Sequence, residues 1–254
     1  NKSMTKLIQY PLHKTNRSFH VPSSVRTIRS NSFNDNNYLR NLTISAGAIG
    51  NYAFQGMTKL RTVRITQGTK KIGKEAFLGC RRLSRIDIAD SVKTIGDYAF
   101  SETNIRVAHI PSGLVKMNAN AFSRCDKLSA FTGGGGRFTV KDGVLYNGPM
   151  TRLMKYPPKK NTKSFTVPRS VKYVSSEAFD RVSHLTKLYF EKGKFENIFK
   201  ALQASASMPY FSQMVVVEGR EGLDGGCSRC IPYEWALAEG YKKIVVVRTR
   251  PEDY

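Results

Sequence analysis

The chain has 254 residues, of which 40% are hydrophobic, and 41 Lys and Arg against 19 Asp and Glu give a formal net charge of +22 at pH 7. The hydrophobic content is sufficient for a core. No apolar run approaches the roughly 18 residues of a transmembrane helix, and residues 1–14 lack the apolar stretch of a signal peptide. These features leave the localisation open.

Copies of one repeat make up most of the first 190 residues, and the clearest copy spans residues 71–88. In each copy an apolar residue precedes a phenylalanine by five positions, and the aligned phenylalanines are Phe33, Phe54, Phe77, Phe100, Phe122 and Phe179. Their successive separations are 21, 23, 23, 22 and 57 residues. A period near 23 indicates a solenoid, because one repeat cannot bury its apolar face alone. We therefore predict a mainly β solenoid of about seven turns with the phenylalanines in its core.

The N-terminal residues 4–33 align without a gap to residues 150–179, and 14 of the 30 positions are identical. The second copy is preceded by residues 138–147, which have the pattern of two strands joined by a turn at Asp142-Gly143. A β-hairpin insertion is therefore expected within residues 137–160. The first copy lacks this half of the hairpin, so Asn1 is expected to lie inside a larger array.

Short strands are predicted where apolar residues alternate, at residues 39–44, 60–65, 83–88 and 185–190, with looser versions at 105–110 and 128–132. Cys80 and Cys125 each follow the repeat phenylalanine by three positions, which predicts buried free thiols. The glycine run at residues 133–136 lacks the Lys-Ser/Thr of a phosphate-binding loop. We expect it to form a flexible turn before the hairpin.

The sequence I-G-K-E-A-F-L-G-C-R-R-L-S-R-I-D-I within residues 72–88, together with the hairpin segment F-T-V-K-D-G-V-L-Y-N, resembles the BspA-type leucine-rich repeat family. The resemblance covers about residues 4–190, and we assign residues 1–190 to this solenoid. It implies a curved solenoid that binds proteins or glycans at cell surfaces, without catalysis and without a fixed ligand. A cell-surface or secreted location follows from the same resemblance.

Outward-pointing strand positions of this solenoid should align from repeat to repeat and form a contact surface. The predicted binding residues are Thr43, Thr62, Arg64, Arg85, Asp87, His109, Lys187 and Tyr189. The alternative is that these are ordinary solvent-exposed positions, because charge alone does not distinguish a contact residue from a solvated one.

The basic residues are concentrated on the repeats, since residues 1–190 contain 32 Lys and Arg against 10 Asp and Glu, whereas residues 191–254 contain nine of each. A surface with this excess attracts polyanions such as nucleic acid, acidic glycans or anionic lipid headgroups through a screened, non-specific field. Solvated lysine and arginine on the turns are the alternative. No feature predicts specific recognition of nucleic acid.

The pattern changes after residue 190. Helical spacing at residues 195–206, apolar strands at 213–217 and 243–248, and a helix beginning near Pro232 predict a small α/β segment over residues 191–254. The motifs L-D-G-G-C and I-P-Y-E-W-A-L-A-E-G resemble the end of bacterial patatin-like phospholipases. That resemblance implies a cytoplasmic lipid acyl hydrolase with Asp224 as the aspartate of a Ser-Asp dyad.

The chain contains no Gly-x-Ser-x-Gly elbow to supply the serine of such a dyad. Asp224 alone cannot hydrolyse an ester, and stabilising an Asp-Gly turn is its alternative role. Cys227 and Cys230 have the spacing of half a zinc site or of a redox pair, but no second pair is nearby, so neither a metal site nor a cofactor is predicted. Whether these two cysteines pair is open.

Two functions are compatible with the sequence. The favoured one is a non-catalytic binding or adhesion module that recognises a protein, glycan or other acidic surface through a basic repeat array. The alternative is a truncated or split patatin-like hydrolase that is docked by the repeats. An artificial join near residue 190 is a third explanation for the change in period and charge.

Overall fold

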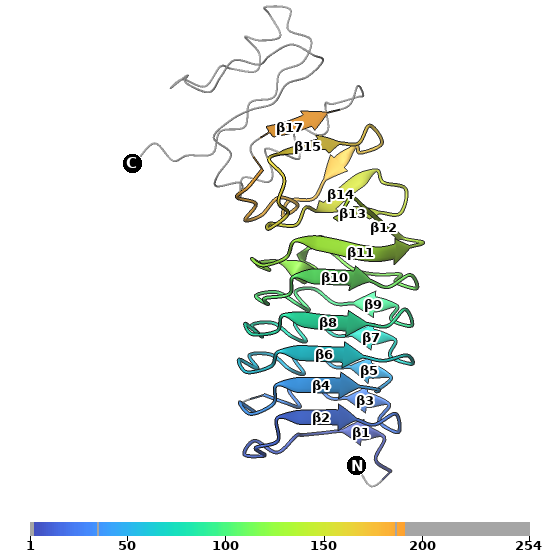
Figure 1. Ribbon diagram of the computed structural model, residues 1–254. Coiled ribbons are helices and arrows are strands. Elements are labelled where there is room, and N and C mark those ends of the chain that lie inside the picture. The colour runs from blue at the N-terminus through green and yellow to red at the C-terminus, as the bar shows by residue number, and fades with distance from the viewer. Residues whose placement is uncertain (1–2, 35, 186, 191–254) are drawn as a thin grey trace, which may run out of the picture.

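The computed structural model describes residues 3–34, 36–185 and 187–190, and these form an elongated stack of β-coils (Figure 1). Within the described residues the helical element is one short 3₁₀ turn, Ala119–Phe122. The predicted mainly β solenoid is confirmed. The predicted α/β segment, including Asp224, Cys227 and Cys230, lies outside the described residues.

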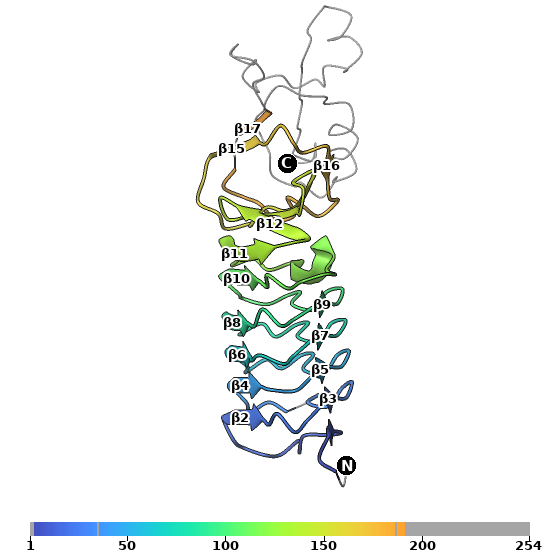
Figure 2. The same cartoon turned by 90° about the vertical axis from the view of Figure 1, so that its right-hand side faces the viewer.

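Each regular coil contributes one longer and one shorter strand, and Figure 2 shows the two resulting parallel sheets on opposite sides of the stack. The longer strands are β2 (Ser18–Val21), β4 (Asn41–Ile44), β6 (Thr62–Ile65) and β8 (Arg85–Ile88). The shorter strands are β1 (Lys6–Leu7), β3 (Thr27–Ile28), β5 (Ala48–Ile49), β7 (Lys71–Ile72) and β9 (Thr94–Ile95). The hydrophobic core lies between these sheets.

Alternation within the longer strands explains which side of the sheet is buried. In β8 the side chains of Ile86 and Ile88 are buried, whereas those of Arg85 and Asp87 are exposed. Successive side chains of a strand point to opposite faces, so one face packs on the core and the other meets solvent. Residue pairs such as Val63 and Ile86 lie in register on neighbouring strands, which stacks apolar side chains above one another.

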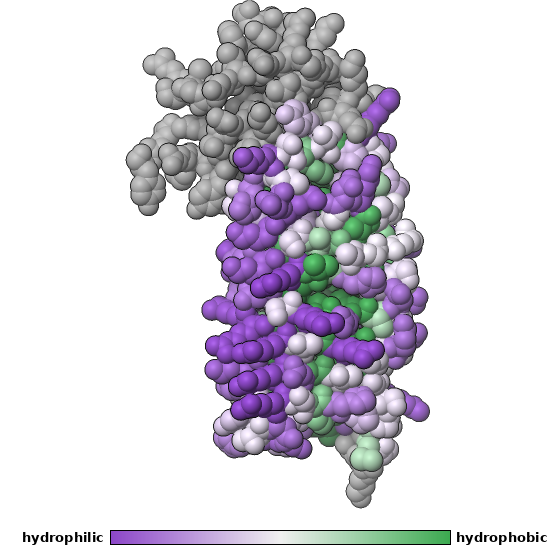
Figure 3. Space-filling view, viewed as in Figure 1, coloured by the Kyte–Doolittle hydropathy of each residue, from purple (hydrophilic) through white to green (hydrophobic). Residues whose placement is uncertain are grey.

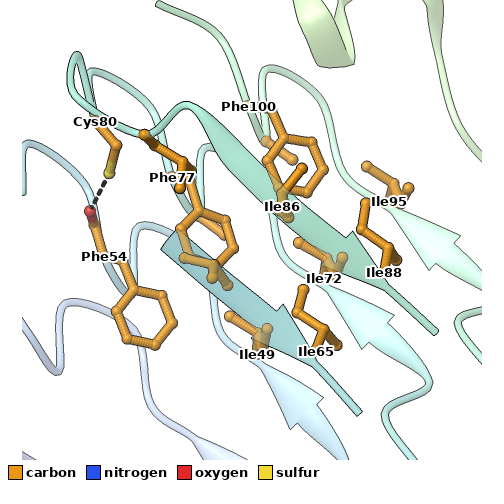
Figure 4. Packing of buried hydrophobic residues seen from close by; sticks show 14 of the residues in the cluster. Ile49, Phe54, Ile65, Ile72, Phe77, Cys80, Ile86, Ile88, Ile95 and Phe100 are labelled. Carbon is orange, nitrogen blue, oxygen red and sulfur yellow. Dashed lines mark hydrogen bonds between the residues drawn. The ribbon is translucent and has the colours of Figure 1, made fainter. Parts of the chain in front are cut away.

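The repeat phenylalanines form a continuous ladder through the core. The ring centroids of Phe54 and Phe77 are 4.9 Å apart, and those of Phe77 and Phe100 are 5.5 Å apart, with the rings stacked in both pairs. Figure 4 shows these rings packed beside isoleucines from both sheets. The predicted core position of the phenylalanines is confirmed.

The two repeat cysteines are buried free thiols, as predicted. The Sγ of Cys80 donates to the Phe54 carbonyl at 3.1 Å, as drawn in Figure 4, and the Sγ of Cys125 donates to the Phe100 carbonyl at 3.1 Å. Burial raises the pKa of Cys80 to about 12 and that of Cys125 to about 11. Because the reactive form of cysteine is the thiolate, both side chains are structural rather than nucleophilic.

The hairpin interrupts the solenoid after β10 (Val107–Ile110) and β11 (Ala130–Gly135). It consists of β12 (Phe138–Lys141) and β13 (Val144–Asn147), and their turn has positive φ at Asp142 and Gly143. The predicted hairpin and its turn are confirmed. The elements that follow are β14 (Arg152–Lys155), β15 (Ser164–Val167), β16 (Tyr173–Val174) and β17 (Lys187–Phe190).

The expected flexible turn at residues 133–136 is wrong for most of the glycine run. Gly133 to Gly135 end strand β11, where Gly133 pairs with Ile110 and Gly134 pairs with Thr139 of β12. A Cβ on Gly133 would lie 2.4 Å from Cε1 of His109. The glycines therefore allow a strand to approach a neighbouring side chain closely, and this requirement is absent from the local sequence pattern.

The coils on either side of the hairpin contact each other although they are far apart in sequence. The Ser123 hydroxyl donates to the Glu177 carboxylate, and Arg181 forms an ion pair with Asp126 at 3.0 Å. Lys155, which is 1% exposed, donates to the Glu177 carbonyl at 2.8 Å, and burial lowers its pKa. The hairpin is thus inserted at one side while the stack continues past it.

Candidate ligand-binding face

The outward side of the longer-strand sheet presents two rows of side chains, which we call the front face. The first row contains Ser18, Asn41, Thr62 and Arg85, and the second contains His20, Thr43, Arg64 and Asp87. Each row is held in register by the parallel strand pairing, so successive members come from successive coils. The front face is therefore a continuous surface assembled from residues about 20 positions apart in sequence.

Five of the predicted binding residues share this sheet, namely Thr43, Thr62, Arg64, Arg85 and Asp87. His109 lies at the equivalent position of β10, which is the next longer strand along the stack (Figure 1). Thr43, Thr62 and His109 are half-buried, and the other three are exposed. The alternation in the sequence thus placed these six residues on one side of the molecule.

Lys187 and Tyr189 are separated from the other predicted residues. Both lie on β17, which pairs with β15 in a sheet of its own beyond the hairpin. Lys187 is in register with Ser164, and Tyr189 is in register with Thr166. The hairpin strands β12 and β13 and the following strand β14 come between these positions and the front face (Figure 1).

Small polar groups on and beside the front face are connected by hydrogen bonds. The Nδ2 of Asn41 donates to the Ser18 hydroxyl at 3.2 Å, and Nε2 of His20 lies 3.0 Å from the Ser45 hydroxyl. The Thr66 hydroxyl donates to the same Ser45 oxygen at 3.0 Å. These bonds orient amide and hydroxyl groups that retain capacity to bond with a polar ligand.

The β10 side of the front face is acidic. Asp90 Oδ1 accepts the backbone N–H of Ser112 at 2.7 Å and lies 3.5 Å from Nε2 of His109. The hydrogen bond from the Ser112 backbone is the main cause that lowers the pKa of Asp90. Together with Asp87, this carboxylate places negative charge near β8 and β10. The positively charged members of the two rows are Arg64 on β6 and Arg85 on β8, so both signs of charge meet at this side of the face.

Three arginines that the alternation pattern missed border the front face, and we call Arg17, Arg40 and Arg61 the arginine ladder. Each residue immediately precedes a longer strand. The N–H of Arg40 donates to the Arg17 carbonyl at 2.7 Å, and the N–H of Arg61 donates to the Arg40 carbonyl at 2.7 Å. Figure 3 shows strongly hydrophilic side chains along the edge where these strands begin.

Within the described part of the chain, no carboxylate forms an ion pair with any of these three arginines. Arg17 and Arg61 are exposed, and Arg40 is half-buried. One signal in the sequence could have identified two of them, because Arg follows the first leucine of the strand motif in both Leu39-Arg40 and Leu60-Arg61. The ladder was missed because only positions inside the alternating strand were considered.

The described residues contain no group of three or more His, Cys, Asp or Glu placed to hold a metal ion. Across the same residues, no helix has the length and apolar character needed to cross a bilayer. The chemistry available on the front face is that of exposed guanidinium, amide, hydroxyl and carboxylate groups, which suits reversible binding through hydrogen bonds and charge.

The chain matches the model of the BspA type leucine rich repeat region, in six copies, over residues 11–129 and 158–208. No curated protein matches it. A leucine rich cell surface protein from Faecalibacterium prausnitzii shares 26% identity with a TM-score of 0.57, over 68% of this chain and 54% of that structure. The pneumococcal vaccine antigen PcpA shares the fold at 19% identity and a TM-score of 0.62, over 84% of this chain and 56% of that structure.

The chain spans about half of the length of both solved structures. The comparisons give no support to the patatin-like resemblance of residues 195–254, and the repeat match itself continues to residue 208. That match covers well over half of the chain and includes the coils that form the front face. The chain therefore belongs to the BspA-type leucine-rich repeat family.

Proposed function

We propose that this chain is a non-catalytic binding module that recognises a protein or glycan through the front face. The observation that carries the proposal is the in-register stacking of outward-facing polar and charged side chains on the four longer strands β2, β4, β6 and β8. Their backbones are already paired and the opposite side of the sheet fills the core. The outward side chains are therefore available for a ligand without any change in the fold.

Adhesion at a cell surface is the setting we propose for this binding. The supporting observation is the similarity to the cell surface protein from F. prausnitzii, which covers 68% of this chain. The solenoid also suits this role physically, because stacked coils display an extended surface that a small globular domain cannot provide.

Charge reversal on the front face tests the proposal. Arg64→Glu combined with Arg85→Glu changes two exposed side chains on β6 and β8. Lys70→Glu combined with Lys93→Glu is the matched control, because both lysines are exposed and the change in net charge is the same. Binding to an array of immobilised glycans and extracellular proteins would be measured for both variants.

We expect the front-face variant to lose the ligands that the control variant retains. Equal losses in both variants, or unchanged binding in the front-face variant, would contradict the proposed site. Turnover of a lipid ester that disappears with Asp224→Asn would contradict the non-catalytic assignment.

A further inference from the structure

The arginine ladder places one arginine on each of three successive coils, at the end of the sheet where the longer strands begin. The backbone bonds from Arg40 to Arg17 and from Arg61 to Arg40 fix this alignment. Neighbouring strands of a sheet lie about 4.7–4.9 Å apart, so the ladder extends over roughly 10 Å. At the next coil the equivalent residue is Ser84, whose N–H donates to the Arg61 carbonyl at 3.1 Å, so the ladder ends at Arg61.

The ladder is suited to a ligand with repeated negative charges. A single carboxylate or sulfate would contact one or two guanidinium groups, whereas a chain of anionic units can contact each coil in turn. Arginine binds such groups through two parallel hydrogen bonds, which gives both energy and orientation. The absence of a carboxylate partner within the described residues leaves these donors free for a ligand.

The groups beside the ladder favour a polysaccharide over a nucleic acid. Ser18, Asn41 and Thr62 follow the three ladder arginines directly in the sequence, and they present hydroxyl and amide groups on the front face. Sugar hydroxyls bond well with such groups. Proteins that bind single-stranded nucleic acid usually stack successive bases on several aromatic side chains, and the front-face rows on these strands contain one aromatic ring, the imidazole of His20.

We propose that the arginine ladder is a subsite for the carboxylate or sulfate groups of a linear acidic polysaccharide, with Ser18, Asn41 and Thr62 bonding to its hydroxyls. This inference rests on the proposed function, because it names the ligand class of the same face. The polymer lies across the strands, along the direction in which the coils are stacked.

The test compares three triple variants of the full chain. Arg17→Gln, Arg40→Gln and Arg61→Gln together remove the ladder, and the corresponding triple change to Lys keeps the charge but removes the bidentate geometry. The matched control is Lys70→Gln, Lys93→Gln and Lys116→Gln. These three exposed lysines are also stacked on successive coils, because Lys93 N–H donates to the Lys70 carbonyl and Lys116 N–H donates to the Lys93 carbonyl.

Affinity would be measured by surface plasmon resonance for heparin, polygalacturonate, neutral dextran, single-stranded DNA and anionic phospholipid vesicles. We expect the Gln variant of the ladder to bind an acidic polysaccharide about 10- to 100-fold more weakly, and the Lys variant about three- to tenfold more weakly. The lysine control should change affinity by less than about threefold. Heparin and polygalacturonate distinguish sulfate from carboxylate recognition. Circular dichroism verifies that all variants are folded.

If the Gln variant of the ladder and the lysine control lose equal affinity for the polysaccharides, the subsite is wrong and binding depends on a diffuse electrostatic field instead. Ladder-dependent binding of DNA or vesicles that is as tight as that of the polysaccharides would overturn the ligand class. If no acidic polysaccharide binds, the inference fails, while binding of other ligands that is sensitive to Arg64→Glu and Arg85→Glu would leave the proposed function intact.

Discussion

The stacked phenylalanines are the residues on which the stability of the coils depends most directly. Phe33, Phe54, Phe77, Phe100 and Phe122 are each no more than 1% exposed, and each ring contacts the ring of the neighbouring coil. A large aromatic side chain contributes more buried apolar area than any other residue of the repeat. Truncating one ring therefore removes contacts with the coils on both sides.

Phe77→Ala should lower the free energy of unfolding by about 3–5 kcal/mol, because it removes apolar burial and leaves a cavity between Phe54 and Phe100. Chemical denaturation followed by circular dichroism measures this change. Lys71→Ala, at an exposed position of β7, is the control and should change stability by less than about 0.5 kcal/mol. A Phe77→Ala protein as stable as the control would contradict a ladder that supports the stack.

At the level of strands and turns, the spacing between coils is set by close backbone contact. Gly50, Gly73 and Gly96 follow the shorter strands of successive coils. A Cβ on Gly73 would lie 2.5 Å from the backbone carbon of Gly50, and a Cβ on Gly96 would lie 2.5 Å from the backbone nitrogen of Lys74. These positions therefore require glycine for steric reasons.

Gly73→Ala should destabilise the protein by about 1–3 kcal/mol, because the added methyl forces neighbouring coils apart. Thermal unfolding monitored by circular dichroism would detect the change. Ser84→Ala at an exposed position provides the control, and it should leave the melting temperature almost unchanged. The same melting temperature for both variants would rule out the steric explanation.

The turns that follow the phenylalanines are connected across coils by charge. Glu102 accepts hydrogen bonds from Arg81 at 3.1 Å and from Arg124 at 3.2 Å, so one carboxylate joins three successive coils. The hydrogen bond from Arg81 is the main cause that lowers the pKa of Glu102 below its ordinary value of 4.5. A carboxylate with a lowered pKa stabilises the folded state above its unfolded pKa, and this contribution is lost as the pH falls through the folded pKa.

Glu102→Gln should therefore reduce the difference in stability between about pH 7 and about pH 3. The effect will be small, about 0.2–1 kcal/mol, because the arginines are largely exposed to solvent. Urea unfolding of both proteins at the two pH values measures it. Asp87→Asn, at an exposed carboxylate of β8, serves as the control. An unchanged pH dependence in Glu102→Gln would show that the bridge contributes nothing.

For the molecule as a whole, charge is the property most relevant to partners. Residues 1–190, which include the coils of both sheets, contain 32 Lys and Arg but 10 Asp and Glu, so the excess of positive charge lies on the coils. Five ion pairs join the described residues, one of them dependent on protonation of His109, so most of the positive charge on the coils has no acidic partner there. Such a surface generates a long-range field that accelerates the approach of polyanions.

Binding of the chain to heparin should weaken steeply as the salt concentration rises, because bound counterions are released when charges pair. A titration series between about 50 and 500 mM NaCl would give the slope of log affinity against log salt concentration. Affinity that does not respond to salt would contradict electrostatic recruitment by the array. Neutral dextran is the reference polymer, for which no such slope is expected.

Much of the fold could be predicted from the sequence, because the apolar side chains repeat at a nearly constant period. The longer strands β4, β6 and β8, the phenylalanine ladder, the buried Cys80 and Cys125 and the hairpin turn at Asp142-Gly143 all follow from local patterns. The second sheet was not predicted, because strands of two residues such as Lys71–Ile72 are too short to show alternation.

The candidate site was only partly predictable, since it depends on which residues of different coils become neighbours. The residue offset is 21 between Asn41 and Thr62 and 23 between Thr62 and Arg85, yet both pairs lie in register. The turns between the strands differ in length, so the strands still align. The hairpin lies between Tyr189 and the front face.

The sequence by itself thus determined the solenoid, because the burial of a repeating apolar pattern permits few other arrangements. The tertiary structure alone decided that Arg17, Arg40 and Arg61 form one ladder, since hydrogen bonds between coils set their alignment.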